Sequence, residues 1–470
     1  MSGVPASSLG PEPGTPTNGR GPNVHVKDLV VAGFGPSGIS LAAAVEDHDD
    51  AHPQDPALTA AYLERAADSA WQPYLVLPGT DIQHHFLRDL ATPRDAASRF
   101  GFVPFLQQSG RFYEFTLLGG YVSRLEWSSY VQWAASQVRQ RPSYHREVVA
   151  VEPVADADGV VRTARVISRD PRDGTRYEDL GRNVVIATSH RPHIPEVFRA
   201  AAGERVFHAH EFLLRAAALP DPPEGRPRRW AVIGAGQTAG EIVLYLHGSD
   251  RRAEVHSLVR HAGFRMYELG HFSNEVYFPQ ETDYVYGLER EARDRVMEQA
   301  RATNYAAVDP DVSTALYAAS YQDGLTGTHR LSMHRRTEVT GVDVRDDNVV
   351  LETAEVFTGA TGRLEVDAVV LCTGYTEPRV PDQLAPFASL LTYEDDGLPV
   401  VTRSFRAVTT DACEVGIYLD GVTEWRHGIA SATSFSQMAL KADAVHRDLR
   451  EQLARQRAAV TDPATASGAV

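Results

Sequence analysis

The sequence predicts an α/β protein with two doubly wound, Rossmann-like dinucleotide-binding domains and a small, partly helical substrate domain. The chain has 470 residues, more than one hydrophobic core normally organises. Two Gly-rich segments, VVAGFGPSGISLAAAV from Val30 and WAVIGAGQTAGEIVLYLH from Trp230, each combine an apolar strand, a tight turn and an amphipathic helix. This arrangement places a diphosphate against backbone N–H groups at a helix N-terminus.

The first Gly-rich loop fits the complete G-x-G-x-x-G pattern. The first glycine makes the tight turn, the second admits the diphosphate, and the third lets the helix pack closely on the strand. The expected dinucleotide contacts in this loop are Gly33, Gly35, Pro36, Ser37 and Gly38.

The second loop repeats the first two glycines, Gly234 and Gly236, and has Ala239 at the third position. Gln237 and Thr238 are expected to contact the dinucleotide beside them. One such loop is weak evidence, because an ordinary Gly-rich turn has the same pattern. Two loops that each follow an apolar strand indicate two bound nucleotides.

The segments that follow the first loop support a doubly wound domain. AYLERAA at 61–67 predicts a second strand that ends in Glu64, near the usual position of an acid that bonds an adenosine ribose. A solvated acid at a strand end would have the same pattern. Residues 143–187 predict a β-rich stretch, and helices are expected at about 285–305 and 311–323. VDAVVLCTGY predicts a late strand that ends in a Gly turn.

Composition and charge exclude several classes of protein. Hydrophobic residues make up 43% and charged residues 23%, as expected of a globular protein. The net charge of −16 argues against nucleic acid or an anionic membrane as partner. No apolar run approaches the ~20 residues of a membrane span, and the N-terminus does not have the pattern of a secretory signal. No metal site is expected.

The two cysteines, Cys372 and Cys413, form no C-x-x-C pair. The lack of a C-x-x-C pair excludes the dithiol oxidoreductases, which also use two nucleotide loops but need two redox-active cysteines. Both lie in apolar segments, where small buried residues are expected. A reducing compartment, the cytoplasm, is therefore predicted.

Several motifs resemble the N-hydroxylating flavin monooxygenases that act on L-ornithine or L-lysine in siderophore biosynthesis. They are LPGTDIQHHFLRDLATPRDAASRFGF at 77–102, SRLEWSSYVQWAA at 123–135, GAGQTAGE at 234–241, FSNEVYFP at 272–279, TNYAAVD at 303–309, LCTGY at 371–375 and IYLDGVTEWRHG at 417–428. The resemblance covers roughly residues 28–445. It implies that one loop binds FAD and the other NADPH, and that the protein forms a dimer or tetramer.

The resemblance also implies a reaction and a domain order. NADPH reduces FAD, the reduced flavin takes up O2 as a C4a-hydroperoxide, and the substrate amine accepts the distal oxygen. The expected segments are a disordered N-terminus at 1–27, an FAD-binding domain at 28–222, an NADPH-binding domain at 223–345 with substrate-domain insertions at about 270–325, a return to the FAD domain and substrate site at 346–453, and a flexible tail at 454–470.

The family's functional residues fall on identifiable positions. The expected catalytic residues are Gln83, beside the flavin, and Asn304. Further cofactor contacts are expected from Glu64, Trp71 and Gly374, and the 2′-phosphate of NADPH is expected to meet Arg260 or Arg265. The predicted substrate contacts are Arg88, Asn274 and Asn304. Each of these residues has an alternative role without substrate contact: Arg88 pairs with Asp89 or Asp95, Asn274 forms a turn, and Asn304 caps the C-terminus of a helix.

Three departures from the family pattern put the amine substrate in doubt. The family's Lys is Arg88 here, its ATG turn reads ATSH with Ser189, and its Ser- and Leu-rich stretch reads IASATSFSQMA. Other amines, a diamine included, therefore remain alternatives. So do a Baeyer–Villiger oxygenase, whose F-x-G-x-x-x-H-x-x-x-W motif GERVFHAHEF fits poorly, and a flavoprotein that oxidises NADPH without hydroxylation.

Overall fold

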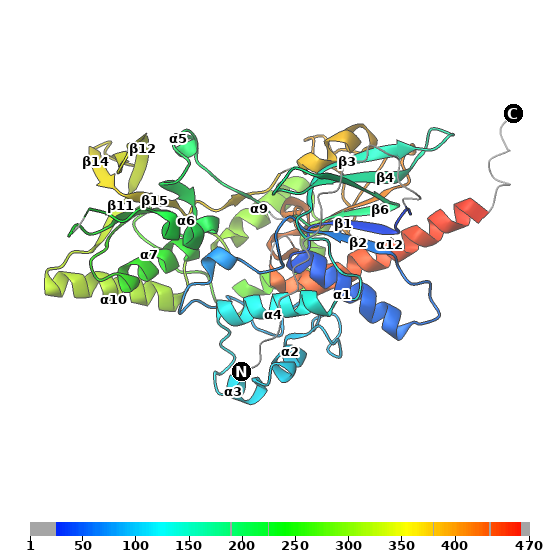
Figure 1. The fold of residues 1–470 in the computed structure, drawn as a ribbon, viewed down its shortest axis with the longest axis horizontal. Helices are drawn as coiled ribbons and strands as arrows, with labels where there is room; N and C mark the ends of the chain where they lie inside the picture. Colours follow the sequence, from blue (N-terminus) through cyan, green and yellow to red (C-terminus); the bar gives the residue numbers. More distant parts are fainter. Residues whose placement is uncertain (1–24, 189, 224, 379, 432–433, 462–470) are drawn as a thin grey trace, which may run out of the picture.

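The computed structural model describes residues 25–461 except 189, 224, 379 and 432–433. The predicted disordered N-terminus lies outside the described residues up to residue 24, and so does Ser189. Two parallel β-sheets, each with helices on one face and an antiparallel meander on the other, lie side by side along the long axis (Figure 1). The doubly wound α/β fold predicted from the sequence is confirmed.

The first sheet has the strand order β17-β18-β6-β1-β2, parallel except for β17. Its strands are β1 (Leu29–Ala32), β2 (Ala60–Leu63), β6 (Asn183–Ile186), β17 (Arg406–Ala407) and β18 (Gly416–Leu419). All four residues of β1, β6 and β18 are buried, as expected of central strands covered on both faces.

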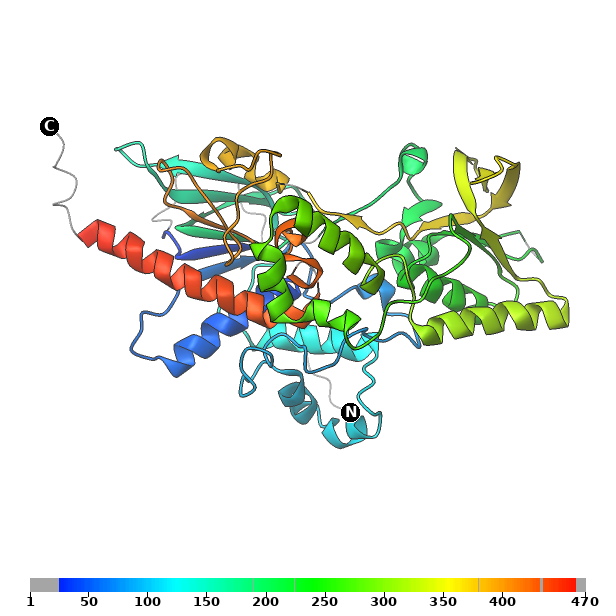
Figure 2. The ribbon, with the colours of Figure 1, turned by 180° about the vertical axis from the view of Figure 1, so that it is seen from behind.

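Helices cover one face of this sheet and a three-stranded meander covers the other (Figures 1 and 2). The helices are α1 (Pro36–Ala51), α2 (Phe102–Gln108), α3 (Phe112–Thr116), α4 (Arg124–Gln137) and α12 (Met438–Thr461), and the meander is β3 (Glu147–Ala155), β4 (Val161–Arg169) and β5 (Arg176–Gly181). The predicted β-rich stretch at 143–187 is thus confirmed. Because α12 runs to Thr461, the flexible tail predicted from residue 454 is wrong as far as the structure describes it.

The second sheet has the order β11-β10-β9-β15-β8 and is entirely parallel. Its strands are β8 (Val206–His208), β9 (Arg229–Ile233), β10 (Glu254–Val259), β11 (Leu331–Arg335) and β15 (Ala368–Leu371). Helices α6 (Phe212–Ala218), α7 (Gln237–Ser249) and α10 (Pro310–Thr326) pack on one face, and α5 (Glu196–Arg199) with the meander β12 (Thr337–Val344), β13 (Val349–Glu355) and β14 (Thr361–Val366) on the other.

The second domain is inserted into the first through two antiparallel crossings. The chain leaves at β7 (Arg191–Pro192) and returns at β16 (Tyr375–Thr376), and these strands pair with each other. The second sheet therefore extends beyond the predicted range 223–345 on both sides. The segment 220–229 connects α6 to β9 and does not mark the domain entry, because β8 already pairs with the distant β15.

Between β10 and α10, a helical segment reaches back to the first domain. It contains η3 (Ser273–Tyr277), α8 (Pro279–Gly287), α9 (Arg290–Ala300) and η4 (Arg301–Thr303), and it packs on α11 (Glu424–His427). Short 3-10 turns complete the fold: η1 (Pro73–Leu75), η2 (Ala209–Glu211), η5 (Asp382–Leu390), η6 (Ile429–Ser431) and η7 (Phe435–Gln437). Since α10 packs on α7 through Val312 and Leu316, the substrate segment ends before α10, earlier than the predicted residue 325.

A buried ion pair joins the two domains. Arg124 on α4 donates from Nη2 to Glu241 Oε1 on α7 at 2.8 Å, and both side chains are almost fully buried. Gln237 Nε2 donates to the same oxygen at 3.0 Å. This buried ion pair therefore links α4 of the first domain directly to α7 of the second. No helix among the described residues is long and apolar enough to cross a membrane.

Candidate active site

A cavity of about 1820 Å³ lies between the two sheets. Both Gly-rich loops open into it, together with the segment that precedes α10 and the start of α12. In parallel α/β sheets, ligands bind at the carboxyl ends of the strands, where these loops lie. One cavity thus holds the contacts predicted for two nucleotides and a substrate.

The loop after β1 has the backbone that a diphosphate requires. Gly33 has φ +105°, and a Cβ there would lie 2.6 Å from Ala187 O. A Cβ on Gly38 would lie 2.4 Å from Gly33 O, so the third glycine provides the close packing of helix and loop. A Cβ on Gly35 would meet no protein atom within 4 Å, so a side chain at this position would obstruct a bound ligand and not the protein itself. Pro36 and Ser37, at the start of α1, also line the cavity.

Glu64 lies directly after β2 and supports this loop. Its carboxylate accepts hydrogen bonds from Phe34 N at 2.8 Å and Ala66 N at 2.9 Å, and the residue lines the cavity. A carboxylate oxygen can accept a further bond, so these contacts are compatible with a ribose hydroxyl. Trp71 also lines the cavity, edge-on to Phe435 with ring centroids 5.5 Å apart.

The loop after β9 repeats this geometry. Gly234 has φ +137°, and a Cβ there would lie 2.3 Å from Cys372 O, whereas a Cβ on Gly236 would meet no atom within 4 Å. Thr238 lines the cavity. The amide of Gln237 is bound on both sides within the protein, since its Oε1 accepts from Asp309 N at 2.8 Å and its Nε2 donates to Glu241.

Only one of the two arginines predicted for the 2′-phosphate lines the cavity. Arg260 directly follows β10 and has no ion-pair partner among the described residues. Arg265 is not among the lining residues, and its guanidinium lies 3.4 Å from His261 Nδ1. Arg260 is therefore the candidate for the phosphate. The sequence did not show that the turn after β10 brings Arg260, but not Arg265, to the cavity wall.

Gln83 joins the two domains at the cavity wall. Its Nε2 donates to Asp309 Oδ2 at 3.1 Å, and its side chain also reaches the Tyr267 hydroxyl. Nearby, burial together with Asp311 and Asp309 raises the pKa of Asp81 to about 6. Gln83 thus lies on the cavity wall, with its amide presented between the two nucleotide loops.

Arg88 is half-buried on the same wall. Its Nη1 donates to Ser436 Oγ at 3.2 Å. The pairings with Asp89 or Asp95 that the sequence left open do not occur. Asp89 instead accepts from Ala91, Thr92 and Phe102, and Asp95 Oδ1 accepts from Ala97 N. Arg88 has no carboxylate partner among the described residues, so its guanidinium is available to an anion in the cavity.

Asn274 and Asn304 come from the inserted helical segment and face the same cavity. Asn274 lies in η3, and its Nδ2 donates to Gly270 O, before that turn, at 3.2 Å. Asn304 follows η4, and its side chain lies within hydrogen-bonding reach of the Tyr305 hydroxyl. The local roles that the sequence left open, a turn for Asn274 and a helix end for Asn304, are present. They leave both side chains on the cavity wall.

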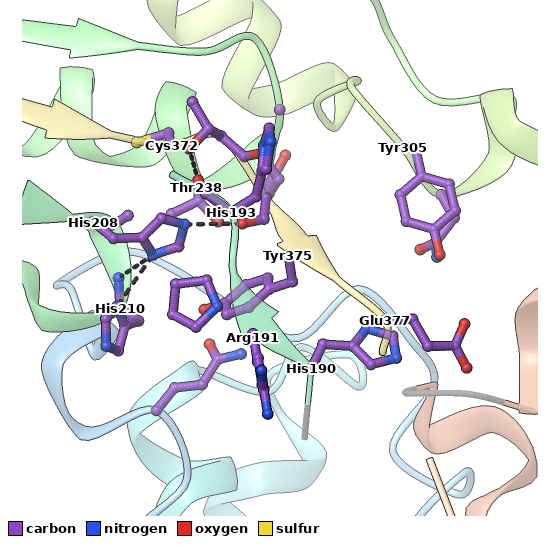
Figure 3. Close-up of a pocket in the computed structure, with 18 of the residues that line it drawn as sticks. His190, Arg191, His193, His208, His210, Thr238, Tyr305, Cys372, Tyr375 and Glu377 are labelled. Atoms are coloured by element: carbon purple, nitrogen blue, oxygen red, sulfur yellow. Dashed lines mark hydrogen bonds between the residues drawn. The ribbon is translucent and has the colours of Figure 1, made fainter. Parts of the chain in front are cut away.

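The crossing strands place further residues in the cavity that sequence reasoning missed. Glu377 and His190 lie on one side of Tyr375, and His208 and His210 on the other (Figure 3). His208 Nε2 lies 2.9 Å from Gly374 O, so the predicted cofactor residue Gly374 is fixed from the second domain. Burial lowers the pKa of His208 to about 4, which makes a neutral imidazole at this position. Among the described residues no cluster could hold a metal ion.

Glu377 and Glu424 are two acidic residues of this wall. Burial, assisted by the charge of Glu424, raises the pKa of Glu377 to about 8. Burial also raises the pKa of Glu424, which accepts a short hydrogen bond from the Tyr305 hydroxyl. Glu377 follows the motif at 371–375 by two residues and Glu424 lies within the motif at 417–428, but neither motif indicates that the two acids meet.

Comparison with known proteins identifies relatives over most of the chain. The family described as L-lysine 6-monooxygenase/L-ornithine 5-monooxygenase matches residues 25–377. An L-ornithine N(5)-monooxygenase of Pseudomonas aeruginosa is 32% identical over 91% of this chain and 94% of its own length.

Solved structures give the same result. A Kutzneria ornithine N-hydroxylase with reduced FAD, NADP+ and L-ornithine has a TM-score of 0.85 and 32% identity over 91% of this chain and all of its own. An L-lysine 6-monooxygenase of Pseudomonas syringae has a TM-score of 0.80 and 38% identity over 91% of this chain and 99% of its own.

Proposed function

Because the chain belongs to the L-lysine 6-monooxygenase/L-ornithine 5-monooxygenase family, we propose that it hydroxylates the side-chain amino group of L-ornithine, with L-lysine as the alternative. It is a flavin-dependent monooxygenase that uses NADPH and O2. The observation that carries the substrate class is the single cavity in which Arg88, Asn274 and Asn304 face the two dinucleotide loops. The product suits the biosynthesis of a siderophore or a related metabolite.

The residues of each loop fit the cofactor assigned to it. FAD fits the loop after β1, where Gly35 leaves the backbone open and Glu64 offers a carboxylate to a ribose. NADPH fits the loop after β9, where Gly236 leaves the same opening and Arg260 offers a cation to a 2′-phosphate. Bound FAD, once reduced, supplies the activation of O2.

The protein's own side chains position the amine. Arg88 binds the substrate carboxylate with a planar guanidinium, while Asn274 and Asn304 offer amide groups to the rest of the amino acid. Gln83 lies at the junction of the two nucleotide loops and orients the reacting region through a neutral amide. The inserted segment reaches this part of the cavity through η3 and η4, whose residues Tyr277 and Thr303 line it beside Asn274 and Asn304.

A panel of substrates tests this function. Purified enzyme with FAD is given NADPH and, in turn, L-ornithine, L-lysine, putrescine, cadaverine and a ketone. The consumption of NADPH, the release of H2O2 and the formation of hydroxylamine are measured together. We expect hydroxylamine from ornithine or lysine at close to one per NADPH. Equal product from the diamines would argue against an amino acid substrate, and NADPH loss with only H2O2 would contradict the function.

We also propose a cytoplasmic homo-oligomer. The two free cysteines, Cys372 and Cys413, support a reducing compartment. The exposed side chains of Tyr317, Tyr321 and Leu325, spaced four residues apart along α10, support a contact between copies of the chain. Sedimentation of the protein and of a Tyr321→Glu variant tests this, since the variant should dissociate.

A further inference from the structure

Two acidic side chains lie together in the cavity wall, apart from both Gly-rich loops. Glu377 follows β16 and Glu424 begins α11, and the backbone N–H of Glu424 donates to Glu377 Oε1 at 3.1 Å. The Tyr305 hydroxyl donates to Glu424 Oε2. Since the Asn304 side chain reaches Tyr305, a continuous polar chain connects a predicted substrate residue to the two acids.

Neither acid has an ion-pair partner among the described residues. Lys441, whose charge acts on Glu377, forms its ion pair with Asp420, with 2.6 Å between Nζ and Oδ1. Arg301 acts on Glu424 only at a distance. Buried carboxyl groups without a counter-ion are costly when charged. An ammonium group in the cavity would supply the positive charge that the two acids lack, and it would donate charge-assisted hydrogen bonds in addition to those that the acids already accept.

The cation Arg88 lies at a different part of the cavity. Tyr277, whose hydroxyl donates to Thr303 O at 3.0 Å, is within electrostatic range of both Arg88 and Glu424. Arg88 donates to Ser436 in η7, whereas Glu377 accepts from the backbone N–H of Glu424 and Glu424 accepts from the Tyr305 hydroxyl, so the cation and the two acids share no hydrogen-bond partner among the described residues. The cavity wall thus carries a cation and a separate pair of acids. This separation complements an amino acid whose carboxylate and side-chain ammonium lie at opposite ends of an extended chain.

We propose that Glu377 and Glu424 form the subsite for the side-chain ammonium group of the substrate, opposite the carboxylate subsite at Arg88. The inference rests on the proposed function. In this subsite one N–H bond of the ammonium breaks and an O–H bond forms on a carboxylate, which leaves the neutral amine with its lone pair. The two acids thus hold the proton that the amine must lose before it can act as a nucleophile.

The subsite predicts a pH dependence of substrate affinity. Glu377 carries its charge only above a pKa of about 8, so affinity for the ammonium should improve as the pH rises through that value. The other titratable or charged groups around the pair are Glu424, His190, Tyr305, Arg301, Asp420 and Lys441. Burial lowers the pKa of His190, and burial raises that of Tyr305, so these two stay neutral across this range.

A pair of ligands separates this subsite from the rest of the site. Norvaline keeps the carboxylate and α-amino group of ornithine but lacks the side-chain amine; norleucine has the same relation to lysine. Binding of each ligand to the oxidised holoenzyme is measured by flavin absorbance for the wild type, Glu377→Gln, Glu424→Gln and the double variant. We expect the affinity for ornithine to fall about tenfold or more, while the affinity for norvaline changes less than about twofold.

Two further variants make the result specific. Glu281→Gln replaces another half-buried acid with a raised pKa outside the cavity, and it should change neither affinity. Arg88→Ala should weaken both ligands together. FAD content and thermal unfolding show that each variant is folded. Equal weakening of ornithine and norvaline in the double variant, or no weakening of either, would overturn the subsite. A wild type that hydroxylates no amine would instead overturn the proposed function itself.

Discussion

The loops after β1 and β9 approach their neighbouring strands in the same way. In each, the first glycine has positive φ and its α-carbon faces a backbone carbonyl, Ala187 O for Gly33 and Cys372 O for Gly234. In each, the second glycine faces open space. The loops differ at the third position, where Gly38 packs on Gly33 but Ala239 is accommodated in the core.

In the second loop, the glycine that permits close packing is Gly240, one residue after the third position of the pattern. A Cβ on Gly240 would lie 2.7 Å from Val312 Cγ1 on α10. The glycine thus serves the packing of α7 on α10. An incomplete fingerprint does not therefore mean an absent dinucleotide site.

The residues that follow the second strand of each domain differ in charge. Glu64 follows β2 and Arg260 follows β10, at matching places in the two domains. An acid there suits a ribose with free hydroxyls, and a cation suits a 2′-phosphate. We propose that the charge at this one position adapts the same structural plan to two different nucleotides.

The largest expected effect comes from filling the open position of each loop. Gly35 and Gly236 have extended backbones that any residue adopts, and a Cβ there meets no protein atom. Gly35→Val should fold but lose FAD, and purify colourless. Gly236→Val should remain yellow, while its anaerobic flavin reduction by NADPH falls on the order of a hundredfold, since the side chain occupies the diphosphate position.

Thermal unfolding of both apoproteins provides the control for this pair. The apo forms should unfold close to the wild-type temperature. If Gly35→Val retained FAD, or Gly236→Val lost FAD but kept NADPH binding, the assignment of the loops would be reversed or wrong.

A smaller effect is expected at Arg88, which belongs to neither loop. Arg88→Ala should raise KM for the amino acid at least about tenfold, because a carboxylate loses a charge-assisted partner that contributes about 1.5–3 kcal/mol. NADPH oxidation without substrate should stay unchanged. Arg88→Lys keeps the charge and should lose less. Unaltered steady-state kinetics in the Ala variant would make Arg88 structural.

Arg260 tests the charge difference between the domains. Arg260→Ala should lower the ratio of kcat/KM for NADPH over NADH by about tenfold or more, because a contact to the 2′-phosphate is lost. Arg265→Ala should change this ratio little, since Arg265 does not line the cavity. A larger effect at Arg265 than at Arg260 would contradict the assignment.

The smallest expected effect concerns pH. A free side-chain amine has a pKa of about 10.4, and only its neutral form can accept oxygen. Coupling should therefore improve between about pH 7 and 9, with about two- to threefold less H2O2 per NADPH. Measurement at saturating substrate decides this, and a flat profile would argue that proton loss does not limit hydroxylation.

The sequence predicted features that depend on local pattern. Both loops, their strands and the buried environment of Cys413 follow from short motifs and apolar runs. The domain boundaries could not be predicted in this way, because β8 and β15 pair across a long stretch of chain. The pair of acids could not be predicted either. Glu377 and Glu424 meet only because the returning strand β16 and helix α11 lie beside each other, and no spacing records that contact.

We propose that oxygen passes from O2 to the side-chain nitrogen of an amino acid in the cavity between the two sheets. Turnover of L-ornithine with NADPH under heavy-isotope oxygen gas, followed by mass spectrometry of the product, tests this proposal. We expect a hydroxylamine on the side-chain nitrogen that carries one heavy oxygen atom, formed at close to one per NADPH. Labelled H2O2 without any labelled hydroxylamine, from ornithine and lysine alike, would contradict it.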